Sequence, residues 1–313
     1  MSLEIHRNPP TNVPPPNSSG DDFVSRVFLN ERGLRAGWRL LLYVVFVLAL
    51  EIGAGVLFQH FLHPRTGDAR PTILIAQELF SFGVVFGAAL IMGLIERRAP
   101  GDYGLPSQGA FGTLFWQGFL IGLVEVSALI GLITLFGGYS FGAIELHGME
   151  AMRWGILWSV FFLVVGLSEE FQFRGYTQFT LADGIGFWPA AVLLSVGFGW
   201  LHRYNPGENW IGAAGVVMIG LLFAFALRRT GSLWLVVGWH ASFDFGETFL
   251  YSVPNSGLLF PGHLSSSSLH GPAWLTGGTV GPEGSVFSFL TMGILFFVVH
   301  RWYPARTTSS PAS

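Results

Sequence analysis

Residues 38–59 read WRLLLYVVFVLALEIGAGVLFQ, an almost uninterrupted apolar stretch with a single acidic residue, Glu51, in its interior. About 20 mostly apolar residues are enough for a helix to cross the hydrocarbon layer of a bilayer. The stretch lacks the alternation of apolar and polar residues that a barrel strand needs, so a strand does not explain it. We therefore predict a transmembrane helix over residues 38–59.

Seven further stretches have the same apolar character: 72–95, 111–136, 154–180, 187–203, 210–227, 232–251 and 285–302. The overall composition agrees with them, because only 11% of the 313 residues are charged, against about 25% in soluble domains. We predict an all-α, polytopic transmembrane helical bundle of about eight spans. This composition excludes a soluble enzyme and a nucleic-acid-binding protein.

The bundle is expected to occupy residues 36–303, after a disordered cytoplasmic tail at 1–35 and before a short C-terminal tail at 304–313. The basic residues predict its orientation, because arginine accumulates on the cytoplasmic side of a membrane. With the N-terminus inside, twelve of the 16 arginines fall in cytoplasmic segments and four fall outside. The long loop 252–284 contains no arginine, as expected outside. Both termini are therefore predicted to be cytoplasmic.

The chain has no cysteine, which excludes disulfides, thiolate metal sites and cysteine nucleophiles. Ionisable residues inside a membrane segment are costly and usually mark function. Glu51, Glu78 and Glu125 each stand alone in the first three spans. For these three we favour a structural role, such as a hydrogen bond to a neighbouring helix or a position near the interface.

Ionisable residues concentrate in later spans, first in the sequence Ser168-Glu169-Glu170-Phe171-Gln172-Phe173-Arg174. Glu170 and Arg174 are four residues apart, so they share a helix face and can form an ion pair. Glu169 points about 100° away and has no arginine at the matching spacing. A carboxylate in a poorly solvated cavity suits a general base. The alternative is a pair of interfacial glutamates at a helix end.

Two further segments carry polar residues at helical spacing. Phe198 and His202 share one face, although a single histidine at a helix end is more often interfacial. His240, Asp244 and Glu247 form a polar stripe on an otherwise apolar helix, which points to a cavity or to a seam of hydrogen bonds between helices. The residue types permit a Zn²⁺ site or a metal-free arrangement around a water.

These segments read Glu169-Glu170-x-x-x-Arg174, Phe198-x-x-x-His202 and His240-x-x-x-Asp244. In order and spacing they resemble the CPBP family of intramembrane proteases, which includes the type II CAAX prenyl endopeptidases and bacterial relatives linked to bacteriocin processing and immunity. The resemblance covers about residues 150–250. It implies an intramembrane endopeptidase that acts on a peptide or membrane-protein substrate, in a bacterial cytoplasmic (inner) membrane, without nucleotide or nucleic acid.

The resemblance also implies roles for individual residues. Glu169 would activate the attacking water with help from His202, while His240 and Asp244 would stabilise the tetrahedral intermediate. A divalent metal, most readily zinc, would use Glu169, His202 and His240, and catalysis without metal remains an alternative. The supporting residues would be Glu170, Arg174 and Phe198, with Glu247 in a second tier.

Two points about this set need the structure. An ionised Asp244 would repel an oxyanion, so it must be protonated, orient His240 or bind a metal. The helical rise also places His202 about 22 Å from the inner start of its span, but His240 only about 12 Å from its own inner start. This count places His202 too far outward to meet the others, unless its span starts in the cytoplasm, is tilted or has other boundaries.

Other interpretations of the sequence remain. Gly138-Tyr139-Ser140-Phe141-Gly142 matches the GxSxG pattern of serine hydrolases, but it falls in an outside loop without the strand–turn–helix context of a nucleophile elbow. A proton-coupled transporter also uses buried glutamate and histidine. A non-catalytic membrane receptor or immunity factor of the same fold is the third alternative.

Overall fold

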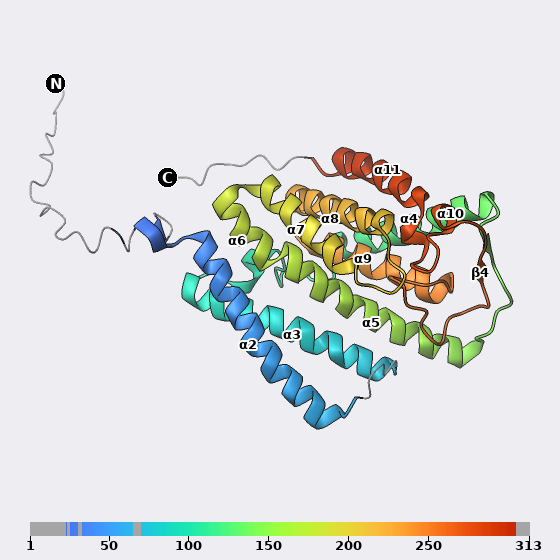
Figure 1. Cartoon of the computed structure of the whole chain (residues 1–313), viewed down its shortest axis with the longest axis horizontal. Coiled ribbons are helices and arrows are strands. Elements are labelled where there is room, and N and C mark those ends of the chain that lie inside the picture. Colours follow the sequence, from blue (N-terminus) through green and yellow to red (C-terminus); the bar gives the residue numbers. More distant parts are fainter. Residues whose placement is uncertain (1–22, 24–25, 31–32, 65–69, 305–313) are drawn as a thin grey trace, which may run out of the picture.

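The computed structural model describes residues 23, 26–30, 33–64 and 70–304. Most of them are helical (Figure 1). The long helices are α2 (Ala36–Leu62), α3 (Pro71–Glu96), α4 (Thr113–Leu135), α5 (Gly148–Arg174), α6 (Tyr176–Ile185), α7 (Phe187–His202), α8 (Trp210–Thr230), α9 (Trp234–Phe245) and α11 (Val286–Trp302). The short ones are η1 (Pro100–Tyr103), the π-helical turn η2 (Gly246–Leu250), α10 (Ala273–Thr276) and η3 (Pro282–Gly284).

All eight predicted apolar stretches are helical, so the all-α prediction is confirmed. By length and composition, five helical segments of the described chain can cross a membrane: α2, α3, α4, α8 and the run formed by α5 and α6. α7 and α11 are apolar but shorter, and the seventh stretch divides into α9 and η2. The protein is an integral membrane protein.

Within the described residues, the strands form two short antiparallel pairs, besides two isolated bridges. β1 (Leu29–Asn30) pairs with β2 (Gly33–Leu34) just before α2, and β3 (Tyr139–Ser140) pairs with β4 (Ser268–Leu269) in the long loops. The Ser140 hydroxyl of the GxSxG match therefore lies on a two-residue strand and not on a nucleophile elbow. Most of the predicted disordered tail, up to residue 22, and most of the C-terminal tail lie outside the described residues.

The fourth predicted span, 154–180, is interrupted where α5 ends. Gly175 follows α5 with φ −83° and ψ −124°, outside the helical region, and the chain continues as α6 in a new direction (Figure 1). α6 then packs against α2 and α7. This break inserts the ten-residue helix α6 between the end of α5 and the start of α7, which decides where His202 lies.

The helices enclose α5, which packs against α3 on one side and α9 on the other. α7 packs against α8, and α2 lies at the edge of the bundle against α3 and α6 (Figure 1). α4 approaches α9 most closely, because glycines leave room for the opposing backbone. A Cβ added at Gly118, Gly122 or Gly238 would overlap backbone atoms of the other helix. Glycine is typical of such close helix contacts in membranes.

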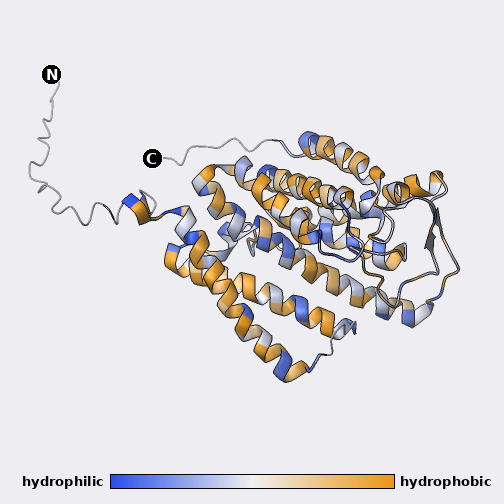
Figure 2. Ribbon diagram, viewed as in Figure 1, coloured by the Kyte–Doolittle hydropathy of each residue, from blue (hydrophilic) through white to orange (hydrophobic). Residues whose placement is uncertain are grey.

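The outer surface of the bundle is strongly apolar. Hydrophobic residues cover much of α2, α3 and α11 (Figure 2), and large side chains such as Ile52, Phe61 and Leu94 are more than two-thirds exposed. An exposed apolar surface of this extent fits contact with lipid. The helix exteriors and the interior core are thus both hydrophobic, and polar groups stand out in the interior.

An ion-pair network joins the N-terminal end of α2 to α3 and α6. Arg39 is buried and its guanidinium lies 2.9 Å from a carboxylate oxygen of Glu96 and 2.9 Å from one of Asp183. Arg98 approaches Asp183 at 3.6 Å, and the Tyr176 hydroxyl donates to Glu96. Arg39 thus makes structural contacts and is also one of the cytoplasmic arginines that predict the orientation of the first span.

Candidate active site

The end of α5 presents its two adjacent glutamates in different surroundings. Glu170 is fully buried, and its Oε1 lies 3.2 Å from the Arg174 guanidinium. This confirms the predicted ion pair. The same guanidinium lies 4.5 Å from the ring centroid of Phe198, so a cation–π contact connects α5 to α7. Glu169 points away from this pair, and its side chain is 30% exposed.

His240 on α9 lies among three carboxylates. Its Nδ1 is 2.9 Å from Glu170 Oε1, and its Nε2 is 3.4 Å from Asp244 Oδ2 and 3.8 Å from Glu169 Oε2. Both ring nitrogens therefore face acceptors, and the doubly protonated cationic ring is the form that pairs with them. The contact with Asp244 matches the orienting option of the sequence prediction. The bond between His240 and Glu170 joins two helices and was not predicted.

His202 ends α7 with one ring nitrogen already occupied. Nδ1 lies 2.9 Å from the carbonyl oxygen of Phe198. Because a carbonyl only accepts, Nδ1 carries a proton, and in the neutral ring Nε2 is then the nitrogen with the lone pair. The ring also packs edge-to-face on Phe198, with centroids 4.3 Å apart. Phe198 therefore positions both the histidine and the Arg174 guanidinium.

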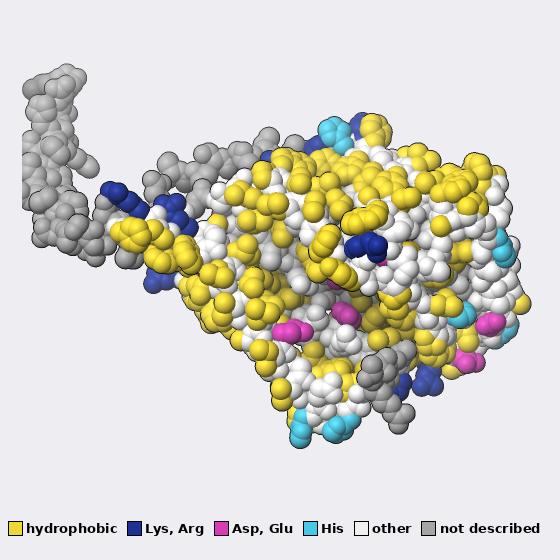
Figure 3. Space-filling model, viewed as in Figure 1, with side chains coloured by type: hydrophobic (Ala, Val, Ile, Leu, Met, Phe, Trp, Pro, Cys, Tyr) yellow, Lys and Arg dark blue, Asp and Glu magenta, His cyan; other side chains and the backbone are white. Residues whose placement is uncertain are grey.

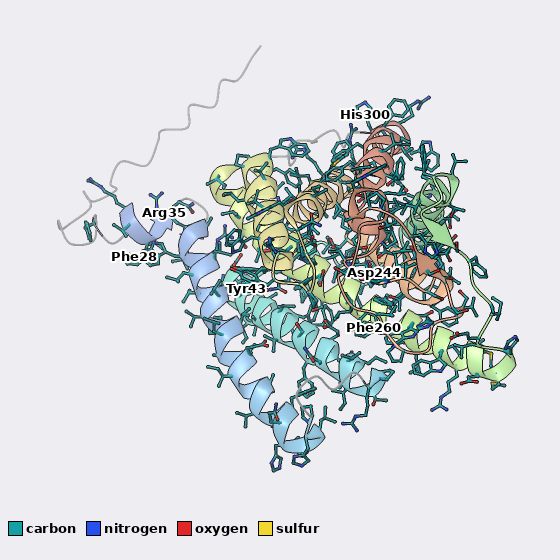
Figure 4. All side chains as sticks on the ribbon, turned by 45° about the vertical axis from the view of Figure 1, so that its right-hand side comes forward. Phe28, Arg35, Tyr43, Asp244, Phe260 and His300 are labelled. Atoms are coloured by element: carbon teal, nitrogen blue, oxygen red, sulfur yellow. The ribbon has the colours of Figure 1, made fainter. Side chains whose placement is uncertain are left out.

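Glu169, His202, His240 and Asp244 line one cavity of about 410 Å³ between α5, α7 and α9. The count that placed His202 too far outward is wrong. The ten-residue helix α6 lies between α5 and α7, so His202 at the far end of α7 returns to the level of Glu169. In Figure 4, Asp244 and the loop residue Phe260, which also lines the cavity, lie near each other inside the molecule.

The second-tier residue Glu247 lies beside this cavity, in an adjoining one of about 100 Å³. His202, His240 and Asp244 line both cavities, while Glu125 and Glu283 line only the smaller one. Glu247 belongs to the π-helical turn η2, a feature that is frequent at functional sites. Its carboxyl group lies within hydrogen-bonding reach of that of Glu283. Two buried carboxyl groups in this contact require a shared proton.

Sequence reasoning did not assign two kinds of residue that line the cavities to the site. Glu78 lies in the site cavity, close enough to Glu169 for their charges to interact. Its isolated position in an apolar span was the available signal. Asn255 and Ser256 belong to the outer loop, and no sequence signal distinguishes them. Glu125 has the structural role that was expected of it, a hydrogen bond to a neighbouring helix. Its carboxylate accepts a 2.6 Å hydrogen bond from the Trp239 indole.

The predicted metal ligands line the same cavity but do not converge on one point. No group of three or more His, Asp or Glu side chains in the described part of the chain is arranged to hold a metal ion. His240 has carboxylate oxygens at both ring nitrogens, and a doubly protonated ring has no lone pair to donate. The donors in this arrangement do not fit zinc, so we assign no chemical step to a metal.

Comparison with known protein families gives one match. Residues 151–246 match the family model described as type II CAAX prenyl endopeptidase Rce1-like. The matched segment contains all three motifs, so the resemblance predicted from them is confirmed over this part of the chain. It supports a protease of the CAAX type that is embedded in a membrane. Comparisons with curated proteins and with solved structures give no match.

Proposed function

We propose that the protein is an intramembrane endopeptidase that hydrolyses a peptide bond with a water activated by Glu169. The observation that carries the proposal is the meeting of Glu169, His202 and His240 around one cavity, inside the segment that matches the Rce1-like family. We further propose that the protein resides in the cytoplasmic membrane of a bacterium, where the resembling family has many members.

In the first chemical step, Glu169 is the proton acceptor and His202 positions the water. The Glu169 carboxylate accepts a proton from a water in the cavity, and the oxygen of that water attacks the carbonyl carbon of the scissile bond. The unprotonated Nε2 of His202 accepts a hydrogen bond from the other O–H of the water and so orients it. Because water is the nucleophile, no acyl-enzyme forms.

Stabilisation of the negative charge falls to the protonated ring of His240. Its Nε2–H donates to the oxygen that becomes negative in the tetrahedral intermediate. Glu170 holds this ring in place through the contact at Nδ1, and the carboxylate of Asp244, 3.4 Å from Nε2, favours its cationic form until the oxyanion takes the hydrogen bond. Glu169 then gives its proton to the leaving nitrogen, which departs as an amine and leaves a carboxylic acid product.

The decisive experiment compares Glu169→Gln with the parent protein purified in detergent. Cleavage of a library of internally quenched peptides should fall by at least about 100-fold, because a general base typically contributes 10²–10⁴ to the rate. Glu150→Gln makes the same change at an exposed position in the first turn of α5 and should retain parental activity. Undiminished cleavage by Glu169→Gln would refute the mechanism.

Two further measurements separate the alternatives. Metal analysis of the pure parent should find less than one bound metal per chain, and a chelator should leave cleavage unchanged. One tightly bound zinc that His202→Ala and His240→Ala remove would instead identify a metalloenzyme. Substrate counterflow in liposomes without any proteolysis would identify a transporter.

A further inference from the structure

A large cleft lies next to the candidate active site, between α2, α3 and the outer loop. Its volume is about 890 Å³, at the upper end of the range for ligand pockets. Glu78, Leu258 and Phe260 line both this cleft and the site cavity. The cleft therefore opens directly onto the cavity that holds Glu169. In Figure 3, acidic side chains gather around a hollow in this face of the molecule.

The lining of the cleft distinguishes a peptide from a lipid chain. It carries Glu51, Gln59, Gln77, Glu78 and Ser81 on the facing sides of α2 and α3. A second groove of about 460 Å³ between the same two helices is lined only by apolar residues and glycine, such as Leu50, Leu57, Leu79, Phe80 and Val84. The apolar groove suits contact with lipid, whereas the polar cleft suits a chain with backbone amides and polar side chains.

The charge in the cleft has one sign. Glu51 and Glu78 line the cleft itself, whereas the cavity at its inner end holds Glu169 and Asp244 together with the cationic His240. No arginine is among the described residues that line either space, and the chain contains no lysine. Fields of one sign in a cleft with low-dielectric walls attract ligands of the opposite charge. The aromatic walls, Phe58 and Phe80 among them, accommodate the aliphatic stem of a long basic side chain.

We propose that this cleft binds one side of the substrate peptide and that Glu78, with Glu51, selects a basic group there, within a few residues of the scissile bond. The inference rests on the proposed protease function and specifies its substrate class. The basic group is a protonated amine or a guanidinium, from a Lys or Arg side chain or from a free amino terminus.

The test uses internally quenched ten-residue peptides of Ala, Leu and Phe, with one Lys placed at each position in turn. A matched set carries Gln in place of Lys, and both sets are made with free and with acetylated amino termini. For the parent, kcat/KM should be about tenfold higher for the best Lys peptide than for its Gln counterpart. The preference should shrink as salt increases, because the charges are screened.

In the double variant Glu51→Gln, Glu78→Gln this Lys-to-Gln ratio should fall to about two or less. Glu150→Gln, at an exposed carboxylate outside both spaces, should keep the parental ratio. An unchanged ratio in the double variant, or a parent that prefers neither Lys nor a free amino terminus, overturns the proposal. If acetylation lowers kcat/KM of the Lys and Gln peptides equally, and the double variant loses this effect, the recognised group is the amino terminus.

A binding measurement separates this proposal from the protease function. Fluorescence anisotropy of labelled Lys and Gln peptides is followed with Glu169→Gln protein, which is expected not to cleave them. If no peptide is cleaved by the parent, but the Lys peptide binds about tenfold more tightly and the double variant loses this difference, the cleft proposal stands and the protease function falls. Equal binding of the two peptides overturns the cleft proposal, whatever the activity.

Discussion

Glu170 connects two cationic groups that would otherwise be isolated inside the bundle. Its Oε1 meets both the Arg174 guanidinium at 3.2 Å and His240 Nδ1 at 2.9 Å. Arg174 is 1% exposed, so water cannot replace this carboxylate. Breaking a buried ion pair by removing one partner costs about 3–5 kcal/mol, because an uncompensated charge remains. The residue that supports the site is therefore also the one that stabilises it.

We predict that substitution of the two adjacent glutamates affects thermal stability differently. Glu170→Gln should lower the unfolding temperature of the detergent-solubilised protein by several degrees, because Arg174 keeps its charge in an apolar environment. Glu169→Gln should leave the unfolding temperature within about 2 °C of the parent, because substitutions at half-exposed sites usually change stability little. Thermal unfolding followed by intrinsic tryptophan fluorescence measures both. Equal stability of the two variants would contradict the assignment of Glu170 as the buried partner.

At the scale of elements, the position of α9 against α4 fixes where His240 lies. Gly122 faces the backbone of α9 at Trp239, one residue before His240, and an added Cβ would overlap the Trp239 carbonyl oxygen and Ser242. Any side chain at Gly122 must push α9 away. His240 contacts Glu169 and Glu170, which lie on the neighbouring helix α5. Even a small shift of α9 therefore changes those contacts.

We predict that Gly122→Ala destabilises the fold and reduces peptide cleavage together. Overpacking of this kind typically costs about 1–3 kcal/mol, and displacement of α9 should lower kcat/KM by at least about tenfold. Gly131→Ala is the matched control on the same helix, because nothing lies within 4 Å of an added Cβ there. The control should be neutral or slightly stabilising. Identical behaviour of the two variants would show that the α4–α9 contact tolerates a methyl group.

A second contact between elements joins the outer loop to η2 through two carboxyl groups. Glu283 in η3 accepts a 2.6 Å hydrogen bond from the Ser256 amide, and its carboxyl group lies within reach of that of Glu247, so that the two can share a proton. Burial raises the pKa of Glu283 to about 8, and the charge of Asp244 adds to the rise. The fold therefore favours the protonated form of a group whose pKa is about 4.5 when unfolded.

This contact predicts that stability falls as pH rises. Between about pH 4.5 and 8 the native state binds a proton that the unfolded state has released, so the free energy of unfolding decreases with pH in that window. The unfolding temperature of the parent should fall between pH 6 and pH 9. Glu283→Gln should show a shallower dependence, because its amide stays neutral, and Glu150→Gln should follow the parent. Parallel pH curves for the parent and Glu283→Gln would exclude the shared proton.

The elements and the pairs within one helix were predictable from sequence, whereas the contacts between helices were not. Apolar stretches identify the spans because a bilayer demands their length, and a spacing of four predicts the pair Glu170–Arg174 and the contact of His240 with Asp244. No spacing rule reaches from α5 to α9, so the bond between Glu170 and His240 appears only in the structure. The break at Gly175 was missed, although the polar residues on both sides of this glycine were an available signal.

At the scale of the whole molecule, the loop 252–284 determines from which side a substrate enters. Asn255, Ser256 and Phe260 of this loop line the site cavity, and Leu258 and Phe260 also line the cleft. The loop contains no arginine, and the arginine distribution predicts that it faces outward. Substrate would then reach Glu169 from the outer side or laterally through the cleft, and not from the cytoplasm.

This orientation can be tested because the chain contains no cysteine, so a single introduced thiol has no background. Ser266 is exposed in the outer loop, and Ser107 is exposed in the segment between α3 and α4, which is predicted to be cytoplasmic. A membrane-impermeant maleimide should label Ser266→Cys in intact cells, and should label Ser107→Cys only after permeabilisation. Peptide cleavage by each cysteine variant is measured as well, because an active variant shows that the labelled protein is folded. The reverse labelling pattern would show that the protein has the opposite orientation in the membrane, with the cleft open toward the cytoplasm.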